Sequence, residues 1–540
     1  MAVITEQTEN LNDYVFVNNN NDAKTKEAIK SGISEVGEYF ANKNIFITGG
    51  TGFLGTVLIE SLLSSHPNIG CIYVLVRGKK RFDPNERIDR LLQKPLFANH
   101  SKKTLAKVVP VVGELSEPNF GFKEGLLNEL LQKVNIIFHS AATIKFSSPL
   151  RTAIKTNLTG TWRTIEFAKK LKNLSSYIFV STAFCNSNNR GLIMETVYKS
   201  KYDPHDMMKM AEDDMAWEDF DEIKCKEMIG NHPNTYTFTK NLAENLMMSD
   251  MAGFPAAIVR PSIVYGTWEH PCKGWVGAAN SGHLGYLAGF IKGIFRTMCG
   301  VARSQIDIIP VDYVINSTLV MAWYAGTRKL DKPEVIHSTS GEVNPLSLGE
   351  FCDIMNESVK RHPADTYVWK PQGKLRNGWR YNLFFYIFHM LPAMLFHIPE
   401  KLFNIGMPQH TALEYMRVFN KGAKAFDYFL DKDFRYSLKN ALKIMSVLNE
   451  VDKDRYTWDA SLCNWTEFID RCLIGVRRFY FKESAETTQW HKNYWAVFNI
   501  LHYGGLGAML LVFLWISGLV FGSTLGYGLA IALWSFLMWL

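Results

Sequence analysis

A glycine-rich loop between a buried strand and a helix constrains this chain most. The loop covers residues 48–55, directly after the apolar segment Ile45–Ile47 and before a helical pattern. Gly49 allows a tight turn, Gly52 lets a phosphate approach the backbone, and Gly55 lets the helix pack closely on the strand. The free N–H groups of the helix N-terminus suit a pyrophosphate. The loop therefore predicts a dinucleotide site formed by Thr48, Gly49, Gly50, Thr51, Gly52, Phe53, Leu54 and Gly55.

Apolar runs alternate with helical stretches between Asn44 and about Ser340. They are rich in Val, Ile and Phe without polar alternation, as expected for parallel strands buried on both faces. We therefore expect an α/β fold with a Rossmann-type doubly wound parallel sheet, followed by a mainly helical domain. The runs are Ile45–Thr48, Cys71–Val76, Val108–Val112, Asn135–Phe138, Tyr177–Val180 and Ala256–Val259.

The C-terminus is apolar far beyond the length of one helix. After Lys492 there is no Asp, Glu, Lys or Arg, whereas one transmembrane helix needs only about 20 apolar residues. A break at residues 522–524 divides this tract into Trp495–Phe521 and Leu525–Leu540. The tract could therefore form one transmembrane span, a hairpin of two spans, or one span followed by a half-embedded second helix. A buried core hairpin is the alternative. We expect a polar tail over 1–40, a dinucleotide-binding domain over 41–340, a helical domain over 341–485 and a membrane anchor over 490–540.

Charge and cysteine usage indicate where the body of the protein lies. The net charge of +7 is spread along the chain, which does not favour nucleic-acid binding. The eight cysteines form no CxxC pair or Cys/His cluster, so we expect reduced thiols and no metal. No signal peptide precedes the body, and cations before the apolar tract favour a cytosolic orientation. These cations are Arg471, Arg477, Arg478, Lys482 and Lys492.

The end of the second strand discriminates between the two nicotinamide cofactors. Enzymes that use NAD usually carry an Asp or Glu there to bind the ribose hydroxyls. Here Val74–Val76 leads into Arg77, Gly78, Lys79, Lys80 and Arg81, with no acid nearby. Arg77 can hold a 2′-phosphate with two hydrogen bonds, which favours NADPH. A solvated basic loop would leave the choice open.

A Tyr-xxx-Lys motif supplies the candidate proton donor. Tyr236 and Lys240 share one helix face because they are four residues apart. An adjacent ammonium can move the tyrosine pKa from about 10 toward working pH, and it can also bind the nicotinamide ribose.

Two strand ends complete the expected site. Ser181 and Thr182 follow the run Tyr177–Val180 and could orient a substrate carbonyl, with Thr182 favoured. His139 is interpreted as structural, and Asn157 as structural rather than chemical. The small residues Ala141 and Ala142 let the backbone approach the cofactor.

Together these motifs resemble those of an extended short-chain dehydrogenase/reductase, and more narrowly those of an alcohol-forming fatty acyl-CoA reductase. They occur along the chain in the same order as in that family. The resemblance covers residues 48–314, and region 341–485 resembles that family's C-terminal domain. Glu114 replaces the usual Asp beside adenine, and the segment Met394–His397 lies where relatives often carry an acid. The matching pieces are Thr48–Gly55, Leu75–Arg77, Phe138–Phe146, Asn157–Thr161, Val180–Phe184, Tyr236–Lys240, Arg260–Val264 and Pro310–Val314. The resemblance implies further cofactor contacts at Glu114, Leu115, Ala141, Ala142, Asn157, Lys240, Pro261, Ile263 and Val264.

The resemblance also implies a reaction and a location. A long-chain fatty acyl-CoA would be reduced by two NADPH through an aldehyde to a primary alcohol and free CoA. The charge-free stretch Tyr381–Pro399 could line an acyl tunnel, lie on membrane lipids or span them, although Pro392 argues against a straight buried helix. We expect the endoplasmic reticulum, with the peroxisome second, and a homodimer stays open.

Three alternatives remain. A hydroxysteroid or sterol dehydrogenase would carry the same glycine loop, Tyr-xxx-Lys motif and membrane segments. A reductase could stop at the aldehyde. A non-catalytic NADPH-binding scaffold would not need to retain Tyr236 and Lys240.

Overall fold

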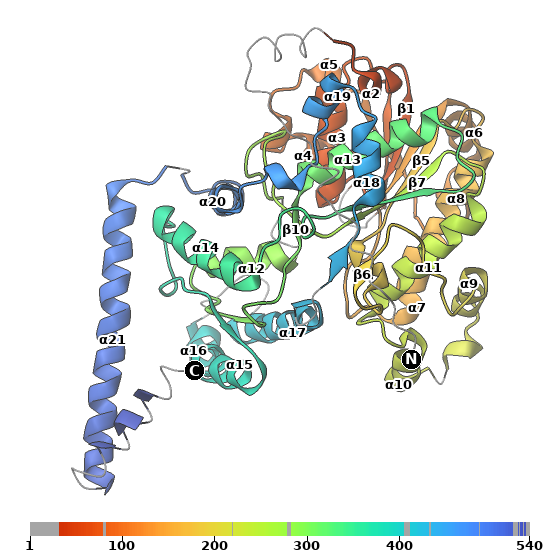
Figure 1. The fold of residues 1–540 in the computed structure, drawn as a ribbon. Helices are drawn as coiled ribbons and strands as arrows, with labels where there is room; N and C mark the ends of the chain where they lie inside the picture. The colour runs from red at the N-terminus through yellow and green to blue at the C-terminus, as the bar shows by residue number, and fades with distance from the viewer. Residues whose placement is uncertain are drawn as a thin grey trace, which may run out of the picture.

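A parallel sheet forms the centre of the molecule (Figure 1). In this computed structural model, the described residues are 32–535 apart from 79–82, 219, 278–281, 404–410, 431–433, 485, 522–526, 529 and 533. The seven-stranded sheet has the order β11-β7-β5-β4-β1-β2-β3, and every neighbouring pair is parallel. Its strands are β1 (Asn44–Thr48), β2 (Ile72–Val76), β3 (Val108–Val112), β4 (Val134–His139), β5 (Ser176–Val180), β7 (Ala256–Pro261) and β11 (Glu334–Ser338).

The six predicted strands are confirmed, and the structure adds β11 at the sheet edge. From β1 the chain builds outward to β2 and β3, and then returns to β4 on the other side of β1. This reversal between β1 and β4 is the position where open α/β sheets bind ligands. The doubly wound fold is therefore confirmed, and the predicted glycine loop lies at this reversal point.

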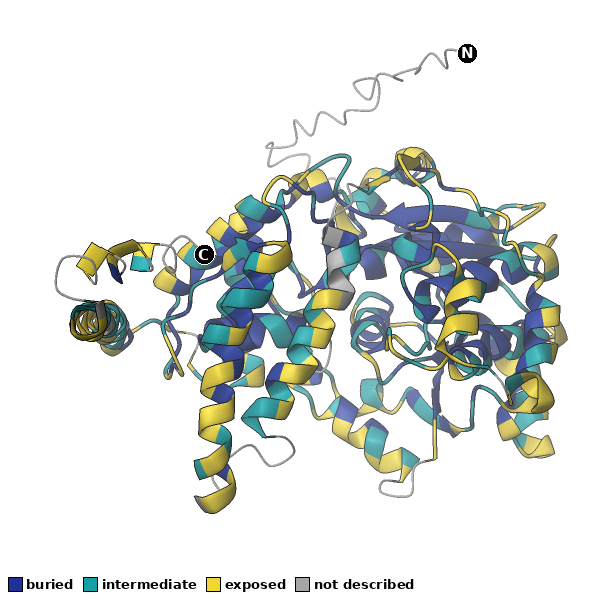
Figure 2. Cartoon of the chain, turned by 90° about the horizontal axis from the view of Figure 1, so that it is seen from below, coloured by how far each residue is buried: buried dark blue, intermediate teal, exposed yellow. Residues whose placement is uncertain are grey.

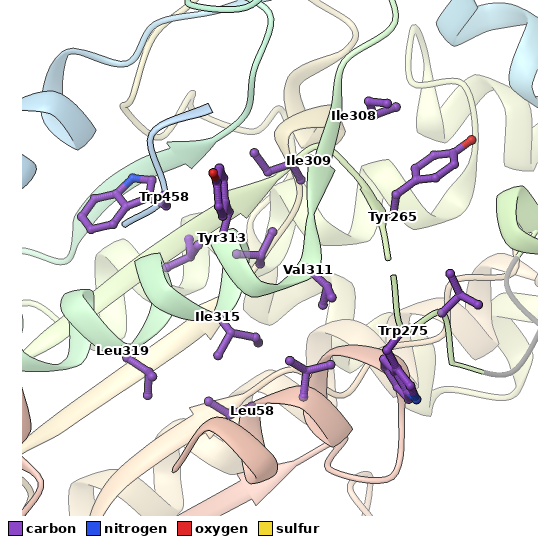
Figure 3. Close-up of a cluster of buried hydrophobic side chains, with 14 of the residues drawn as sticks. Leu58, Tyr265, Trp275, Ile308, Ile309, Val311, Tyr313, Ile315, Leu319 and Trp458 are labelled. Carbon is purple, nitrogen blue, oxygen red and sulfur yellow. The ribbon is translucent and has the colours of Figure 1, made fainter. Parts of the chain in front are cut away.

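Helices cover both faces of the sheet and create two apolar cores. One core joins α3 and α13 to one face, and the other joins α6, α8, α9 and α11 to the opposite face. Figure 3 shows part of the first core, where Leu58 of α3 lies below Val311 and Ile315 of α13. The helices up to residue 327 are α2 (Glu35–Tyr39), α3 (Phe53–Ser65), α4 (Pro84–Leu92), α5 (Lys102–Leu105), α6 (Glu124–Lys133), α7 (Leu150–Ala153), α8 (Gly160–Lys170), α9 (Pro204–Glu212), α10 (Glu222–Ile229), α11 (Thr235–Asp250), α12 (Gly282–Ile291) and α13 (Val311–Thr327).

The region after β11 is mainly helical, as predicted. Short parallel strand pairs tie it to the first part: β13 (Arg435–Tyr436) pairs with β6 (Leu192–Ile193), and β12 (Lys374–Arg376) pairs with β9 (Thr297–Cys299). A third pair joins β8 (Ile263–Tyr265) to β10 (Ile308–Pro310). The helices are α14 (Leu348–Arg361), α15 (Gly378–Phe385), α16 (Leu391–Phe403), α17 (Ala412–Leu430), α18 (Lys439–Ser446), α19 (Glu450–Arg455), α20 (Trp465–Gly475) and α21 (Gln489–Phe521).

Parts of the helical region pack back onto the Rossmann sheet and its helices. The Asp452 carboxylate at α19 accepts hydrogen bonds from the Ser34 hydroxyl at 2.5 Å and from the Val36 backbone N–H at 3.1 Å. Tyr456 Oη lies 3.0 Å from His66 Nε2 beside α3. The two parts therefore share one continuous apolar core, to which Trp458 also belongs (Figure 3).

The helix at Pro392 continues through the proline. A π-helical turn over Tyr386–Met390 joins α15 to α16 and lies directly before Pro392. Such a wider turn accommodates a residue that has no backbone N–H. The run is not fully buried: one side packs on β9 and α17, whereas eight large apolar side chains are exposed. The exposed residues are Trp379, Tyr386, Leu391, Met394, Leu395, Phe396, Ile398 and Leu402.

The last long helix, α21, lies at one side of the molecule, and its second half extends away from the body (Figure 1). By length and composition, α21 and the run Gly378–Leu402 are the two helices among the described residues that could cross a membrane. Figure 2 shows mostly exposed and half-exposed residues on α21, in contrast to the buried sheet. Most of the predicted second segment Leu525–Leu540, like the tail over residues 1–31, lies outside the described residues.

Candidate active site

The glycine loop forms a cradle at the carboxyl edge of β1. Gly49 has a φ of +77°, and a Cβ there would lie 2.7 Å from the Ala141 backbone nitrogen. A Cβ on Gly55 would lie 2.4 Å from the Gly49 carbonyl oxygen, so α3 begins in contact with the turn. A Cβ on Gly52 would meet only that same oxygen, at 3.1 Å. The open side at Gly52 and the N-terminus of α3 therefore fit a dinucleotide pyrophosphate.

Buried polar side chains hold the strands around this cradle. His139 Nδ1 lies 2.7 Å from Thr48 Oγ1, and His139 Nε2 lies 3.0 Å from Thr161 Oγ1. Burial and the charge of Lys240 hold the pKa of His139 well below its usual range, so the ring is neutral. The Ala141 backbone N–H donates to Thr48 Oγ1 at 3.3 Å. His139 thus joins β1, β4 and α8, which agrees with the structural role predicted for it.

Asn157 fastens the loop after β4 to the helix that carries the tyrosine. Its Oδ1 accepts from the Thr143 backbone N–H at 2.8 Å, and its Nδ2 donates to Thr239 Oγ1 at 3.0 Å. In the chain, Ala142 connects Ala141 of the cradle to Thr143, which Asn157 holds. Asn157 therefore positions backbone beside the cofactor cradle.

Two arginines flank the far side of the glycine loop. Arg77 directly follows β2 and is exposed. Arg87 of α4 donates to the Arg77 carbonyl oxygen at 2.8 Å and to Thr51 Oγ1 at 3.4 Å. Within the described chain, neither arginine forms an ion pair with a carboxylate. Arg87 is absent from the sequence prediction, and the predicted Lys79, Lys80 and Arg81 lie outside the described residues.

The remaining predicted cofactor residues lie at the same edge of the sheet. Glu114 and Leu115 follow β3, and the Glu114 carboxylate accepts from the Leu115 backbone N–H at 3.1 Å. Pro261 ends β7, and Ile263 and Val264 begin β8. The fold thus gathers the ends of β1, β2, β3, β4, β5 and β7, because parallel strands share one carboxyl edge.

Tyr236 and Thr182 form the central pair of the site. Tyr236 lies in the first turn of α11, whose N-cap Asn234 accepts from the Thr237 backbone N–H at 2.9 Å. A hydrogen bond joins the Tyr236 and Thr182 side chains. Ser181 lies beside the buried Cys185 thiol instead. Of the two predicted hydroxyls, Thr182 is therefore the neighbour of the tyrosine.

The predicted lowering of the tyrosine pKa does not occur in this structure. Burial raises the pKa of Tyr236 above its ordinary value, only partly opposed by the hydrogen bond to Thr182. The Lys240 ammonium donates to the Val180 carbonyl oxygen at 2.8 Å, and it lies 4.4 Å from the centre of the Phe179 ring. Burial lowers the pKa of Lys240 to about 8, although the Glu244 charge opposes this shift. Tyr236 therefore retains its proton at neutral pH.

An aromatic wall covers Tyr236 and was not predicted from the sequence. The Phe146 ring stacks on Tyr236 with centroids 6.1 Å apart, and Phe429 lies 5.8 Å from Phe146. Phe184 closes the other side, 5.1 Å from Phe429. These rings come from the loop after β4, the segment after β5 and the end of α17. Phe146 therefore gives the Tyr236 ring an apolar neighbour, and Phe429 and Phe184 extend this apolar surface.

No group of His, Cys, Asp and Glu that could hold a metal ion occurs among the described residues. All eight cysteines are free thiols.

Comparison with known families decides what this chain is related to. The NAD-binding profile described as male sterility protein matches residues 47–318, and a second profile of that description matches residues 388–483. A Drosophila melanogaster protein named "Putative fatty acyl-CoA reductase CG8303" is 73% identical over 503 residues, which cover 93% of each chain. The chain belongs to the fatty acyl-CoA reductase family. It is thus an oxidoreductase with a nicotinamide cofactor. Membership of this family disfavours the hydroxysteroid or sterol dehydrogenase alternative.

More distant relatives agree with this family. Fatty acyl-CoA reductase 1 of Homo sapiens is 31% identical, and the match covers 88% of this chain and 92% of the human protein. Among solved structures, the terminal R domain of the myxalamid biosynthetic pathway superposes with a TM-score of 0.54 at 18% identity, covering 86% of this chain and all of that domain (100%). An archaeal thiolation-reductase di-domain superposes with a TM-score of 0.51 at 16% identity, covering 88% of this chain and 84% of that one. These two likenesses concern the fold.

Proposed function

We propose that this chain reduces a long-chain fatty acyl-CoA to a primary fatty alcohol and free CoA, through an aldehyde, with two NADPH. The observation that carries the proposal is the Tyr236–Thr182 pair beneath the wall of Phe146, Phe184 and Phe429. It provides two hydroxyls for a reacting carbonyl and an apolar surface for the chain attached to it. This chemistry also agrees with the names of the relatives.

The hydroxyl pair has the right protonation state for reduction. NADPH would supply the hydride at each of the two stages. Thr182 and Tyr236 would hydrogen-bond the carbonyl oxygen and stabilise the negative charge that develops on it. Because burial raises the pKa of Tyr236, its hydroxyl carries the proton that the alkoxide finally receives. In the first stage the C–S bond breaks, and CoA leaves as a thiol.

The cofactor preference for NADPH is supported by Arg77 and Arg87. The Arg87 guanidinium donates to Thr51 of the glycine loop and to the Arg77 carbonyl oxygen, and neither arginine has a carboxylate partner among the described residues. The end of β2 carries no acid for a ribose hydroxyl. Two unpaired guanidinium groups suit the dianionic 2′-phosphate of NADPH. Lys240 would bind the nicotinamide ribose in place of the Val180 carbonyl.

The acyl group is the least polar part of the proposed substrate. Each methylene transferred from water into an apolar site contributes roughly 0.8 kcal/mol, so even a short aromatic channel favours long chains. Phe429 is the contribution of the helical region to this aromatic wall, since it lies in the last turn of α17. The aldehyde produced in the first stage is equally apolar and can stay in the channel for the second.

The proposed location is a membrane. The helix α21 has 33 residues and is therefore about 50 Å long. Its part after Tyr503, which extends beyond the body, is about 27 Å long and close to the roughly 30 Å of a hydrocarbon core. The exposed apolar side of the run Gly378–Leu402 would lie on the same bilayer, in preference to lining a tunnel. The catalytic part would face the cytosol, with the endoplasmic reticulum first and the peroxisome second.

Product analysis tests this proposal directly. The full-length protein in detergent is incubated with palmitoyl-CoA and NADPH or NADH, and both the lipid product and cofactor oxidation are quantified. We expect hexadecanol with two NADPH consumed per alcohol, and slower oxidation of NADH. Accumulation of hexadecanal alone would support the reductase that stops at the aldehyde. Absence of NADPH oxidation with any acyl-CoA would favour a non-catalytic scaffold.

The variant Tyr236→Phe tests the assigned donor. Loss of a positioned proton donor reduces kcat by roughly 10²- to 10⁴-fold. The matched control Tyr202→Phe removes a half-buried hydroxyl outside the site and should keep the wild-type rate. Full activity of Tyr236→Phe would exclude this tyrosine as the donor.

A further inference from the structure

The helix α21 is held by the body only over its first half. His491 Nε2 lies 2.6 Å from Asp365 Oδ1, and the ring of Tyr367 lies 5.6 Å from Tyr494 and 5.4 Å from Phe498. Further along, the Trp369 indole N–H donates to His502 Nδ1 at 3.0 Å.

The contact of Lys370 with Tyr503 marks where α21 leaves the body. The Lys370 ammonium donates to the Tyr503 hydroxyl oxygen at 2.9 Å. A Cβ built on Gly504, Gly505 or Gly507 would meet nothing within 4 Å. The free half of the helix, which begins after Tyr503, is the part available to a bilayer.

Basic side chains gather at this exit level. Lys374 is exposed on β12, and its backbone N–H donates to the Arg296 carbonyl oxygen at 3.3 Å, just before β9. Arg296, Lys370 and Lys374 all lie close enough to His502 to interact with it electrostatically. Lys370 and Lys374 interact with Tyr503 in the same way. We call Arg296, Lys370 and Lys374 the exit cluster. Its members come from two neighbouring strand ends and the segment that contacts α21.

The exit cluster has no carboxylate partner among the described residues. Nearby cations differ in this respect: Lys292 pairs with Glu483, and the buried Arg477 lies 3.4 Å from Glu483 and 3.6 Å from Asp365. Arg477 is one of the cations that the sequence suggested for the membrane face, but these acids neutralise it. Burial without a compensating acid lowers the pKa of Arg296 to about 10. A bound anion would offset that cost.

Aromatic side chains surround the exit cluster. The Arg296 guanidinium lies 5.7 Å from the Trp369 ring centre, and Trp369 is 40% exposed. Trp379, which is 56% exposed, begins the apolar run Gly378–Leu402 directly after β12. Tryptophans and cations at the end of an apolar helix are typical of the headgroup layer of a bilayer. The exit cluster therefore lies at the level of lipid phosphates.

We infer that the exit cluster binds the headgroup of an anionic phospholipid where α21 enters the membrane. This inference rests on the proposed insertion of α21, but not on the proposed reaction. The exposed Lys374 would contact the phosphate or carboxylate from the solvent side, and the half-buried Lys370 and Arg296 would contact it from the side of the body. The bound lipid would fix the depth and tilt of α21 relative to the catalytic body.

Lipid retention tests the inference on the full-length protein. The protein is embedded in nanodiscs with equal amounts of phosphatidylserine and phosphatidylcholine, and the lipids that it retains are identified by native mass spectrometry. The double variant Lys370→Gln/Lys374→Gln is compared with wild type. The matched control Lys209→Gln/Lys226→Gln removes two exposed lysines on α9 and α10, far from α21 (Figure 1).

We expect wild type and the control to retain phosphatidylserine preferentially. Each lysine near an anionic surface contributes about fivefold in binding, so the double variant should lose the preference by roughly 25-fold. Equal retention of both lipids by wild type would overturn the inference. If 1 mM CoA displaces the retained phosphatidylserine and phosphatidylcholine does not, the lipid inference would be overturned, and the exit cluster would instead be a site for the phosphates of the CoA substrate. Alkaline extraction of wild type from vesicles would show separately that α21 does not insert.

Discussion

Lys240 shares a helix face with Tyr236, yet it does not ionise the tyrosine. Its ammonium turns to the Val180 carbonyl oxygen, while Tyr236 is hydrogen-bonded to Thr182. At the residue scale, a protonated Tyr236 thus lies in the same site as a buried Lys240. Burial of the Lys240 charge destabilises the folded protein, and this loss of stability can be measured.

The stability of the protein should depend on pH through Lys240. Its pKa is about 8 when folded and 10.5 when exposed, so the unfolded chain binds more protons between these values. Stability should therefore rise with pH from about 8 to 10.5, by roughly 3 kcal/mol in total. Below pH 8 the full cost is present, and Lys240→Met should be more stable than wild type.

Thermal unfolding at pH 7.0 and pH 9.5 checks this prediction. The stability advantage of Lys240→Met over wild type should shrink at the higher pH, while the variant is inactive at both. Lys209→Met, at a side chain that is 78% exposed, is the control. An advantage that is equal at both values would contradict the folded pKa of about 8.

Arg87 should contribute to cofactor selection together with Arg77. A hydrogen bond to a charged group contributes about 1.5–3 kcal/mol, so Arg87→Ala should raise the KM for NADPH by roughly 10- to 100-fold. The KM for NADH should stay unchanged, since NADH has no 2′-phosphate. Arg90→Ala, on the same helix but paired with Glu86 at 2.6 Å, should leave both constants unchanged. Equal losses for both cofactors would indicate a merely structural role.

At the scale of elements, α17 connects the helical region to the chemistry. Its first part packs on β9, α15 and α16, but its last turn places Phe429 against Phe146 and Phe184. The π-helical turn over Tyr386–Met390 lets the α15–α16 run continue past Pro392 and remain alongside α17. A helix with an exposed apolar side and the helix that carries Phe429 thus form one unit.

Phe429→Ala should lengthen the preferred acyl chain. Removing the ring leaves apolar space, and each additional buried methylene contributes roughly 0.8 kcal/mol, or about fourfold. The ratio of kcat/KM for stearoyl-CoA to that for palmitoyl-CoA should therefore rise about tenfold. Phe419→Ala is the control, because Phe419 stacks on Phe295 at 3.5 Å in a different cluster of the same helix. The same change in both variants, or none in Phe429→Ala, would place the acyl chain elsewhere.

At the scale of the whole molecule, α21 combines a docked half with a free half. Deleting residues 504–540 should leave the fold intact, because the contacts from His491 to Tyr503 are retained. The truncated protein should be extracted from membranes by alkaline carbonate, whereas the full-length protein should remain in the pellet. If the truncated protein also resists extraction, the run Gly378–Leu402 spans the bilayer itself.

Much of this architecture follows from local sequence patterns. The glycine loop, the six buried strands and the Tyr-xxx-Lys helix depend on neighbours within a few residues, so periodicity and composition predict them. The charge-free tract after Lys492 predicts α21 for the same reason. The strand β11 was missed because its run Glu334–Ser338 mixes polar and apolar residues.

Other features depend on contacts between distant parts of the chain. Arg87 meets Thr51 across the first β–α–β unit, and Phe429 meets Phe146 from nearly three hundred residues away. The choice of Thr182 over Ser181 depends on which hydroxyl the α11 helix reaches. Likewise, only the pairing of β9 with β12 brings Arg296 and Lys374 together beside α21. By itself the sequence determined the dinucleotide-binding fold, the Tyr-xxx-Lys helix and the long apolar helix α21, because each is local; tertiary packing decided which side chains surround Tyr236 and which apolar side chains stay exposed.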